Sequence, residues 1–266
     1  MFVQIILILF MLVLIWKIAS HLIDEWRSLD FNGELQKSVI IMEEPESGVT
    51  SEDGAAEGNP GDAIASKNED INEESEEDVK VIIPAAIDFD SLHEISEDAV
   101  AWLYLPDTKI NYVIAQAEDN EYYLRRLLDG TGANCGTLFM DYRCSAGFTD
   151  YNTVIYGHHM KDGTMFASLM EYQEQEYYEA HPVMYLYVPG HRYTLELIAG
   201  YTTDTEDRIY SIPATKEDWN TILANAYRHS TFESGIIAKE GDRLVTLSTC
   251  SYAYDDGRYV VVGRLE

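Results

Sequence analysis

The amino-acid sequence predicts a mainly β domain whose strands close into a barrel. From residue 102 onward the chain holds eight short runs rich in β-branched and aromatic residues, separated by turn residues or brief helical stretches. Runs of this kind favour a closed barrel over an open parallel sheet. The eight predicted strands cover residues 102–106, 109–115, 136–141, 152–157, 183–188, 192–203, 243–250 and 258–265.

Four helical segments are predicted around these strands. Residues 87–101 have helical spacing, with Ser96 as a candidate cap. Two helical inserts are expected at residues 120–128 and 165–178, and a further helix at residues 216–229. The last of these lies between the sixth and seventh strands, so the barrel is expected to carry one helical insertion there.

The N-terminal residues 1–23 are predicted to form a transmembrane anchor. The segment is almost entirely apolar apart from Gln4 and Lys17, and about 20 apolar helical residues cross a bilayer. The alternative is a cleaved signal peptide, which normally has a positive start and a small-residue cleavage site. Neither feature is present, and an uncleaved anchor is favoured. Residues 24–41 are expected to form a short juxtamembrane helix, broken near Gly33.

The composition changes sharply after this helix. Residues 42–79 are rich in Glu, Asp, Gly, Ser and Asn and contain no aromatic residue. Such a segment cannot bury enough apolar surface to offset the entropy of ordering. We therefore expect residues 42–79 to be a disordered acidic linker that spaces the anchor from a globular domain at residues 80–266.

The charge and the cysteines exclude several classes of protein. A formal charge of −29, with 47 acidic against 18 basic residues, argues against nucleic acid as a partner. The three cysteines are an odd number without a CxxC pair, which fits neither a disulfide framework nor a zinc site. A bridge between Cys135 and Cys144 is left open. In an exported domain at least one thiol stays free, and reactivity would explain it.

Two candidate groups for chemistry lie at the ends of predicted strands. Cys250 ends the run RLVTLSTC and is followed by a polar loop, although a buried structural cysteine is the common alternative. His158 and His159 follow the run NTVIYG. A metal site at this pair is not expected, because adjacent residues on a strand point to opposite faces and no third ligand is evident.

A cation is expected beside the cysteine. Arg258 opens the last strand eight residues after Cys250, so a short loop can bring the two side by side. An arginine stays charged and offers several donors to an oxyanion or a peptide carbonyl. Arg264 is the alternative on the same face of that strand.

Together these residues resemble the sortase family. TLSTC at 246–250 is similar to the sortase signature around the nucleophile, and YGHHM at 156–160 is typical of class B. Arg258 matches the family's arginine at the start of the last strand. Further segments that resemble class B lie at residues 109–127, 136–143 and 216–229.

The resemblance implies a sortase-type barrel of eight strands with N-terminal helices and a helix inserted between the sixth and seventh strands. It implies Cys250 as nucleophile, His158 as catalytic histidine, and Arg258 as the positive group. The remaining residues that it places in the site line the groove for the substrate peptide: Asn120, Leu124, Tyr156, Ser248 and Thr249. The sequence departs from the family at Cys144, where asparagine is common.

The activity that the resemblance implies is transpeptidation. The enzyme would cleave the C-terminal sorting signal of an exported protein after threonine, hold the acyl group as a thioester, and pass it to an amine of a cell-wall precursor or a pilin. No metal or organic cofactor is expected, and the catalytic domain would lie on the extracytoplasmic face of the cell membrane. Two alternatives remain, a membrane-tethered cysteine hydrolase and a catalytically silent binding module.

Overall fold

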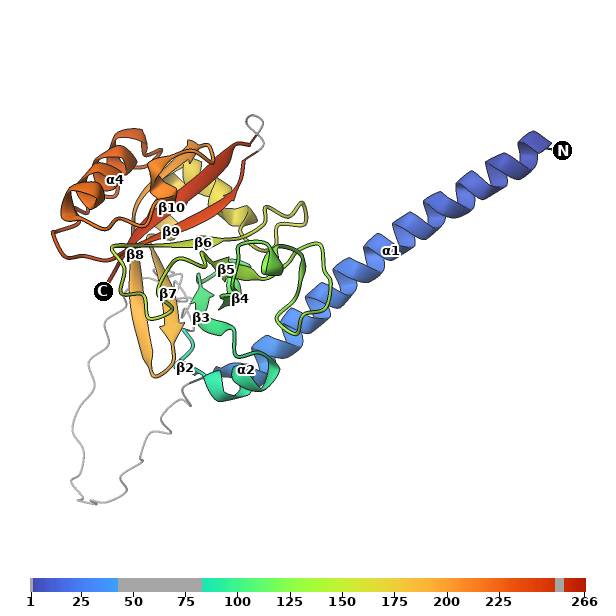
Figure 1. The fold of residues 1–266 in the computed structure, drawn as a ribbon, viewed down its shortest axis with the longest axis horizontal. Coiled ribbons are helices and arrows are strands. Elements are labelled where there is room, and N and C mark those ends of the chain that lie inside the picture. The colour runs from blue at the N-terminus through green and yellow to red at the C-terminus, as the bar shows by residue number, and fades with distance from the viewer. Residues whose placement is uncertain (1, 43–82, 252–255) are drawn as a thin grey trace, which may run out of the picture.

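The computed structural model describes residues 2–42, 83–251 and 256–266 and contains a closed barrel of eight strands, with the long N-terminal helix extending away from it (Figure 1). The order around the barrel is β10-β8-β7-β3-β4-β5-β6-β9. The β4–β5 and β6–β9 pairs are parallel, and the other neighbouring pairs are antiparallel. The strands are β3 (Ala99–Tyr104), β4 (Asn111–Ala115), β5 (Leu138–Met140), β6 (Asn152–Tyr156), β7 (Val183–Val188), β8 (His191–Thr203), β9 (Leu244–Cys250) and β10 (Arg258–Leu265). The predicted barrel is confirmed.

Helices cover the barrel and connect its strands. The helix expected between the sixth and seventh barrel strands is present with the predicted bounds, as α4 (Lys216–His229). The Thr215 side chain caps it by accepting from the Asp218 backbone N–H. The same connection holds the 3-10 helix η3 (Arg208–Tyr210), and other connections hold η1 (Tyr122–Arg125), η2 (Ala167–Gln173) and the helix α3 (Gln175–Ala180).

The helix predicted over residues 87–101 is wrong in extent. The observed α2 is Phe89–Ile95, its N-cap is Asp88, and Ser96 lies at its C-terminal end. The chain then enters β3 at Ala99, where pairing with β4 and burial override the local helical spacing. The expected insert at residues 120–128 is likewise reduced to the single turn of η1.

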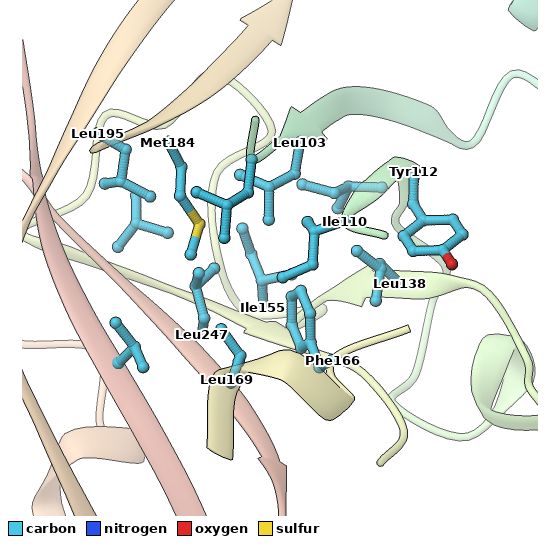
Figure 2. Close-up of a cluster of buried hydrophobic side chains, with 14 of the residues drawn as sticks. Leu103, Ile110, Tyr112, Leu138, Ile155, Phe166, Leu169, Met184, Leu195 and Leu247 are labelled. Carbon is cyan, nitrogen blue, oxygen red and sulfur yellow. The ribbon is translucent and has the colours of Figure 1, made fainter. Parts of the chain in front are cut away.

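The barrel interior holds the main apolar core (Figure 2). Because side chains alternate along a strand, every second residue points inward. On β6 and β9 the inward residues include Ile155 and Leu247, which are fully buried and pair across the parallel ladder. Their outward neighbours Tyr156 and Ser248 also form a pair, and this outer face carries the candidate site.

The N-terminal segment forms one continuous helix, α1 (Phe2–Val39), without the break expected near Gly33. Its first half projects away from the barrel (Figure 1), and by length and composition the helix could cross a membrane. Its last turns pack on the barrel, where Leu35 and Val39 are buried with α2 and with Trp102 of β3.

The ends of the acidic segment lie together. The two-residue strands β1 (Ile40–Ile41) and β2 (Ala86–Ile87) pair, with Ile41 opposite Ala86. The predicted linker itself, apart from Met42, lies outside the described residues, and its disorder stays a prediction. Its role as a spacer likewise stays a prediction, and the structure shows only that the last turns of α1 contact the barrel and that β1 pairs with β2.

Candidate active site

Cys250 and Arg258 lie opposite each other at the ends of β9 and β10. The antiparallel register pairs their Cα atoms directly, and directly opposite residues of such a pair share one face of the sheet. The Arg258 Nη1 also donates to the Gly257 carbonyl at 3.0 Å. Cys250 is a free, partly exposed thiol. The positive charge is thus held beside the thiol by strand pairing.

The parallel pairing of β6 and β9 brings His158 to the same end of the barrel. The ladder extends past the strand, since the Gly157 N–H donates to the Ser248 carbonyl at 3.0 Å. A Cβ atom at Gly157 would lie 2.5 Å from side-chain atoms of both Leu138 and Phe166. Glycine therefore lets the chain pack tightly at the point where it turns outward to His158.

All eight predicted site residues line one open cleft of about 660 Å³ on the outer face of the barrel. They come from the η1 segment, from the end of β6, and from β9 and β10. Further cleft residues that sequence reasoning missed include Phe139, Arg143, Thr205, Glu206, Asp207, Arg208, Tyr210 and Ser211. The catalytic and groove roles of the eight stay predictions, while their convergence is an observation.

Thr249 differs from the other predicted groove residues. Strand alternation turns its side chain to the opposite face from Cys250, and its hydroxyl is buried with no hydrogen-bond partner. A side-chain contact between this threonine and a peptide in the cleft is therefore not expected. Thr249 borders the cleft through its position beside Cys250 rather than through its hydroxyl.

The imidazole of His158 is held by the main chain. Its Nε2 lies 2.7 Å from the Leu124 carbonyl oxygen, and because a carbonyl only accepts, Nε2 carries a proton. Burial lowers the pKa of His158 below its usual value, the Leu124 hydrogen bond opposes that shift, and the Arg125 charge reinforces it. The Nδ1 atom is then the nitrogen that gains or loses the titrating proton.

His159 has a contact that the sequence did not indicate. Its Nδ1 lies 3.2 Å from the Cys250 carbonyl oxygen, to which it donates. The sequence-based interpretation treated His159 only as a neighbour of His158. The bond ties the loop that carries His158 to the strand end that carries Cys250.

Tyr210 forms the wall of the cleft facing β9. Its hydroxyl is 2.9 Å from the Ser248 hydroxyl, and its ring stacks on Tyr156 with centroids 6.1 Å apart. Burial raises the pKa of Tyr210 to about 12, so the phenol stays neutral. The residue lies in the 3-10 helix η3, which no sequence motif marks.

The remaining cysteines and the alternative arginine lie outside the cleft. Cys135 and Cys144 are free and buried, and burial raises the pKa of both thiols, that of Cys144 to about 11. Arg264 lies near the far end of β10, in ion pairs with Glu196, Asp242 and Glu266. Arg258 is therefore the β10 arginine at the cleft. Within the described ranges, no cluster of His, Cys, Asp or Glu could hold a metal ion.

Comparisons with known proteins match this arrangement. The sortase domain model matches residues 103–266. Sortase B of Listeria monocytogenes is 39% identical over 181 residues, covering 65% of this chain and 72% of that protein. The Staphylococcus aureus sortase B–substrate complex is 34% identical, with a TM-score of 0.63, over 67% of this chain and 84% of the other.

A sortase B structure complexed with triglycine is similar as well. It is 32% identical, with a TM-score of 0.63, and the match covers 67% of this chain and 85% of that one. The family model covers more than half of the sequence, and the relatives agree with it in both sequence and fold. The chain therefore belongs to the sortase family of cysteine transpeptidases, in its class B.

Proposed function

We propose that Cys250, His158 and Arg258 carry out the transpeptidation of this sortase. The observation that supports the proposal is strand register, which sets Cys250 opposite Arg258 and brings His158 to the same cleft through the β6–β9 pairing. Each of the three is a residue type suited to its role: a nucleophile, a proton donor and acceptor, and a permanent cation.

The first half of the reaction forms a thioester. The Cys250 thiolate attacks the carbonyl carbon of the threonine in a sorting signal, and the carbonyl electrons move to oxygen. Arg258 stabilises that oxyanion, since it is charged and lies opposite the thiol. The imidazolium of His158 gives a proton to the nitrogen as the C–N bond breaks, and the C-terminal fragment leaves as an amine.

The second half transfers the acyl group. The neutral His158 accepts a proton from an incoming amine as that amine attacks the thioester carbonyl. The new amide forms, and the Cys250 thiolate leaves. The Leu124 carbonyl supports both halves, because it fixes the Nε2 proton and leaves proton exchange to Nδ1.

The partners proposed for this chain are a sorting-signal peptide and an amine. The similar S. aureus enzyme was solved with a substrate, and a similar sortase B with triglycine. The open cleft, with Leu124 and Asn120 on one side and Tyr210 on the other, suits an extended peptide. The natural amine is proposed to belong to a cell-wall precursor or a pilin.

The proposed location is the cell membrane, with one span and the catalytic domain on the extracytoplasmic face. Support comes from α1, whose first half is apolar and exposed while its last turns pack on the barrel. Sorting signals belong to exported proteins, so an enzyme that acts on them must face outward.

The test uses the full chain in detergent micelles. It is incubated with fluorogenic peptides of LPxTG-like, NPxTN-like and SPxTG-like sequence, with and without triglycine, and products are read by mass spectrometry. We expect cleavage after threonine and a triglycine adduct, both lost in Cys250→Ala. A free acid as the sole product despite added amines would favour the hydrolase. Cleavage by Cys250→Ala would overturn the proposal.

A further inference from the structure

A buried carboxylate lies behind one wall of the cleft. The Asp141 side chain is fully buried and accepts hydrogen bonds from the Asn120 amide at 3.0 Å and from the Tyr156 hydroxyl at 2.9 Å. Both donors belong to residues that line the cleft. A buried charge of this kind is costly unless its oxygens are satisfied, so the carboxylate orders the donors around it.

Arg143 supplies the matching charge and links this cluster to the opposite wall. Its Nε and Nη2 contact the two Asp141 oxygens at 2.8 and 2.7 Å. The same Nη2 donates to the Tyr210 carbonyl at 2.9 Å. One guanidinium therefore contacts both the carboxylate behind Asn120 and Tyr156 and the backbone of η3.

The backbone around the pair is anchored to the barrel. The Asp141 N–H donates to the carbonyl of Val154 in β6 at 2.9 Å, and the Arg143 N–H donates to the Asp141 carboxylate at 3.0 Å. Burial disfavours the charged carboxyl, yet the Arg143 bonds hold the pKa of Asp141 below its usual range. The pair therefore stays ionised at neutral pH, and its charge-assisted bonds are the strong kind.

We propose that Asp141 and Arg143 are positioning residues that hold two walls of the cleft, the segment with Asn120 and η1 and the segment with Tyr210 and η3, at a fixed separation and thereby set affinity for the substrate peptide. The inference rests on the proposed function of the cleft. Neither residue is assigned a part in bond breaking. Their effect passes through Asn120 in the first wall, through Tyr210 in the second, and through Tyr156, which bonds to Asp141 and stacks on Tyr210.

The central variant is Arg143→Lys, which keeps the charge but removes the fork that spans Asp141 and Tyr210. We expect KM for the sorting peptide to rise roughly tenfold, because the walls lose charge-assisted bonds, with kcat changed less than about twofold. Alkylation of Cys250 by iodoacetamide should keep its rate, since this small reagent does not depend on cleft width.

Arg264→Lys is the matched control. Arg264 also sits among carboxylates, those of Glu196, Asp242 and Glu266, but near the far end of β10. We expect it to lower the melting temperature without moving KM. An equal rise of KM in both variants would show a general loss of stability and would overturn the proposal.

A second readout needs no substrate. Hydrogen exchange, measured on the full chain, should quicken in Arg143→Lys at residues 119–126 and at residues 207–211, and in Arg264→Lys at neither. Unchanged exchange at both walls would contradict the positioning role even if no peptide in the panel were cleaved. Cleavage failure in the unaltered chain with quickened exchange in Arg143→Lys would instead contradict the proposed function alone.

A double variant tests whether Arg143 acts through the carboxylate. In an Asp141→Asn background, Arg143→Lys should add less than about twofold to KM, because the two residues work as one unit. If the double variant instead showed the product of the two single fold changes in KM, the residues would act separately, and this result would overturn the proposal.

Discussion

The outer face of β9 and β10 differs between its two ends. At one end Leu244 and Val262 are buried beneath α4 in an apolar cluster that includes Ile222. At the other end the same face carries Ser248, Cys250 and Arg258 and opens into the cleft. Both ends are held by one ladder of backbone hydrogen bonds, so the difference lies in the side chains and in what covers them.

This contrast separates stability from chemistry along a single strand pair. The end beneath α4 removes apolar surface from water and stabilises the barrel. At the open end, the Cys250 thiol and the Arg258 guanidinium have no apolar cover. The backbone register of β9 and β10 positions these residues, rather than packing of their side chains in an apolar core. Substitutions at the two ends should therefore have opposite signatures, with lost activity at one and lost stability at the other.

The largest effect is expected from Arg258→Ala. Removing one charged donor from a developing oxyanion costs about 10²–10³ in kcat by analogy with other acyl-transfer enzymes. The melting temperature should change little, because the side chain lies at the open end of the ladder. Steady-state kinetics on the sorting peptide and calorimetry measure the two quantities.

Val262→Ala is the matched substitution on the same strand. Val262 is fully buried beneath α4, so its truncation should lower the melting temperature and leave kcat intact at a temperature well below unfolding. If instead Val262→Ala lost as much kcat as Arg258→Ala, the separation of the two ends would be wrong.

The next effect is on stability, from Ile222→Ala in α4. The side chain is 2% exposed, and truncation of a buried isoleucine typically costs about 2–5 kcal/mol of unfolding free energy. Denaturant unfolding measures the loss, and Cys250 alkylation in native buffer should be unchanged. A faster alkylation would show that α4 also shapes the cleft end.

A smaller contrast is expected among the three thiols. Cys135 and Cys144 are 7% and 6% exposed and have raised pKa values, whereas Cys250 opens to the cleft. Native-state labelling with iodoacetamide should modify Cys250 at least about tenfold faster than either of the others. Labelling is read by peptide mapping, and comparable rates at all three would contradict the burial pattern.

The smallest effect concerns His158 and acid. Burial, reinforced by Arg125, lowers its pKa, so the unfolded chain binds this proton at a higher pH than the folded one. Stability linked to His158 is therefore fully present above about pH 6.5, the unfolded value, and is lost as the pH falls toward the folded pKa. The imidazole resonance should titrate below about pH 6.5 in Cys250→Ala. A midpoint above that value would contradict the shift.

The variant His158→Gln separates the acid sensitivity due to His158 from that due to other titratable groups. The variant cannot take up the proton, so its melting temperature should fall less steeply between about pH 6.5 and more acidic values than that of the unaltered chain. Parallel curves for the two proteins would mean that other groups account for the acid sensitivity.

Much of the fold was predictable because the strands carry strong local signals. The bounds predicted for β7, β10 and α4 match the structure, and those for β9 differ by one residue. The extent of α2 was not predictable, since Ala99 and Ala101 join β3 through pairing with β4, a contact distant from the local helical pattern.

The site was predictable where residues follow a motif along the chain and not where space alone joins them. Cys250, His158 and Arg258 each lie at or just beyond the end of a strand, so strand register brings them together. Arg143, Asp141 and Tyr210 meet only through the folded loops. The inward turn of the Thr249 side chain was missed although strand alternation could have revealed it.

The most direct test of the chemistry at the open end is to trap the intermediate. The full chain is mixed with an excess of the intact sorting peptide that it cleaves, in the absence of an amine. The reaction is quenched in acid and analysed by intact mass and peptide mapping. We predict an adduct on Cys250 with the mass of the N-terminal peptide fragment, and its loss when triglycine is added before quenching. Peptide cleavage with no adduct on Cys250, or with an adduct on Cys135 or Cys144, would contradict the assignment of the open end as the catalytic site.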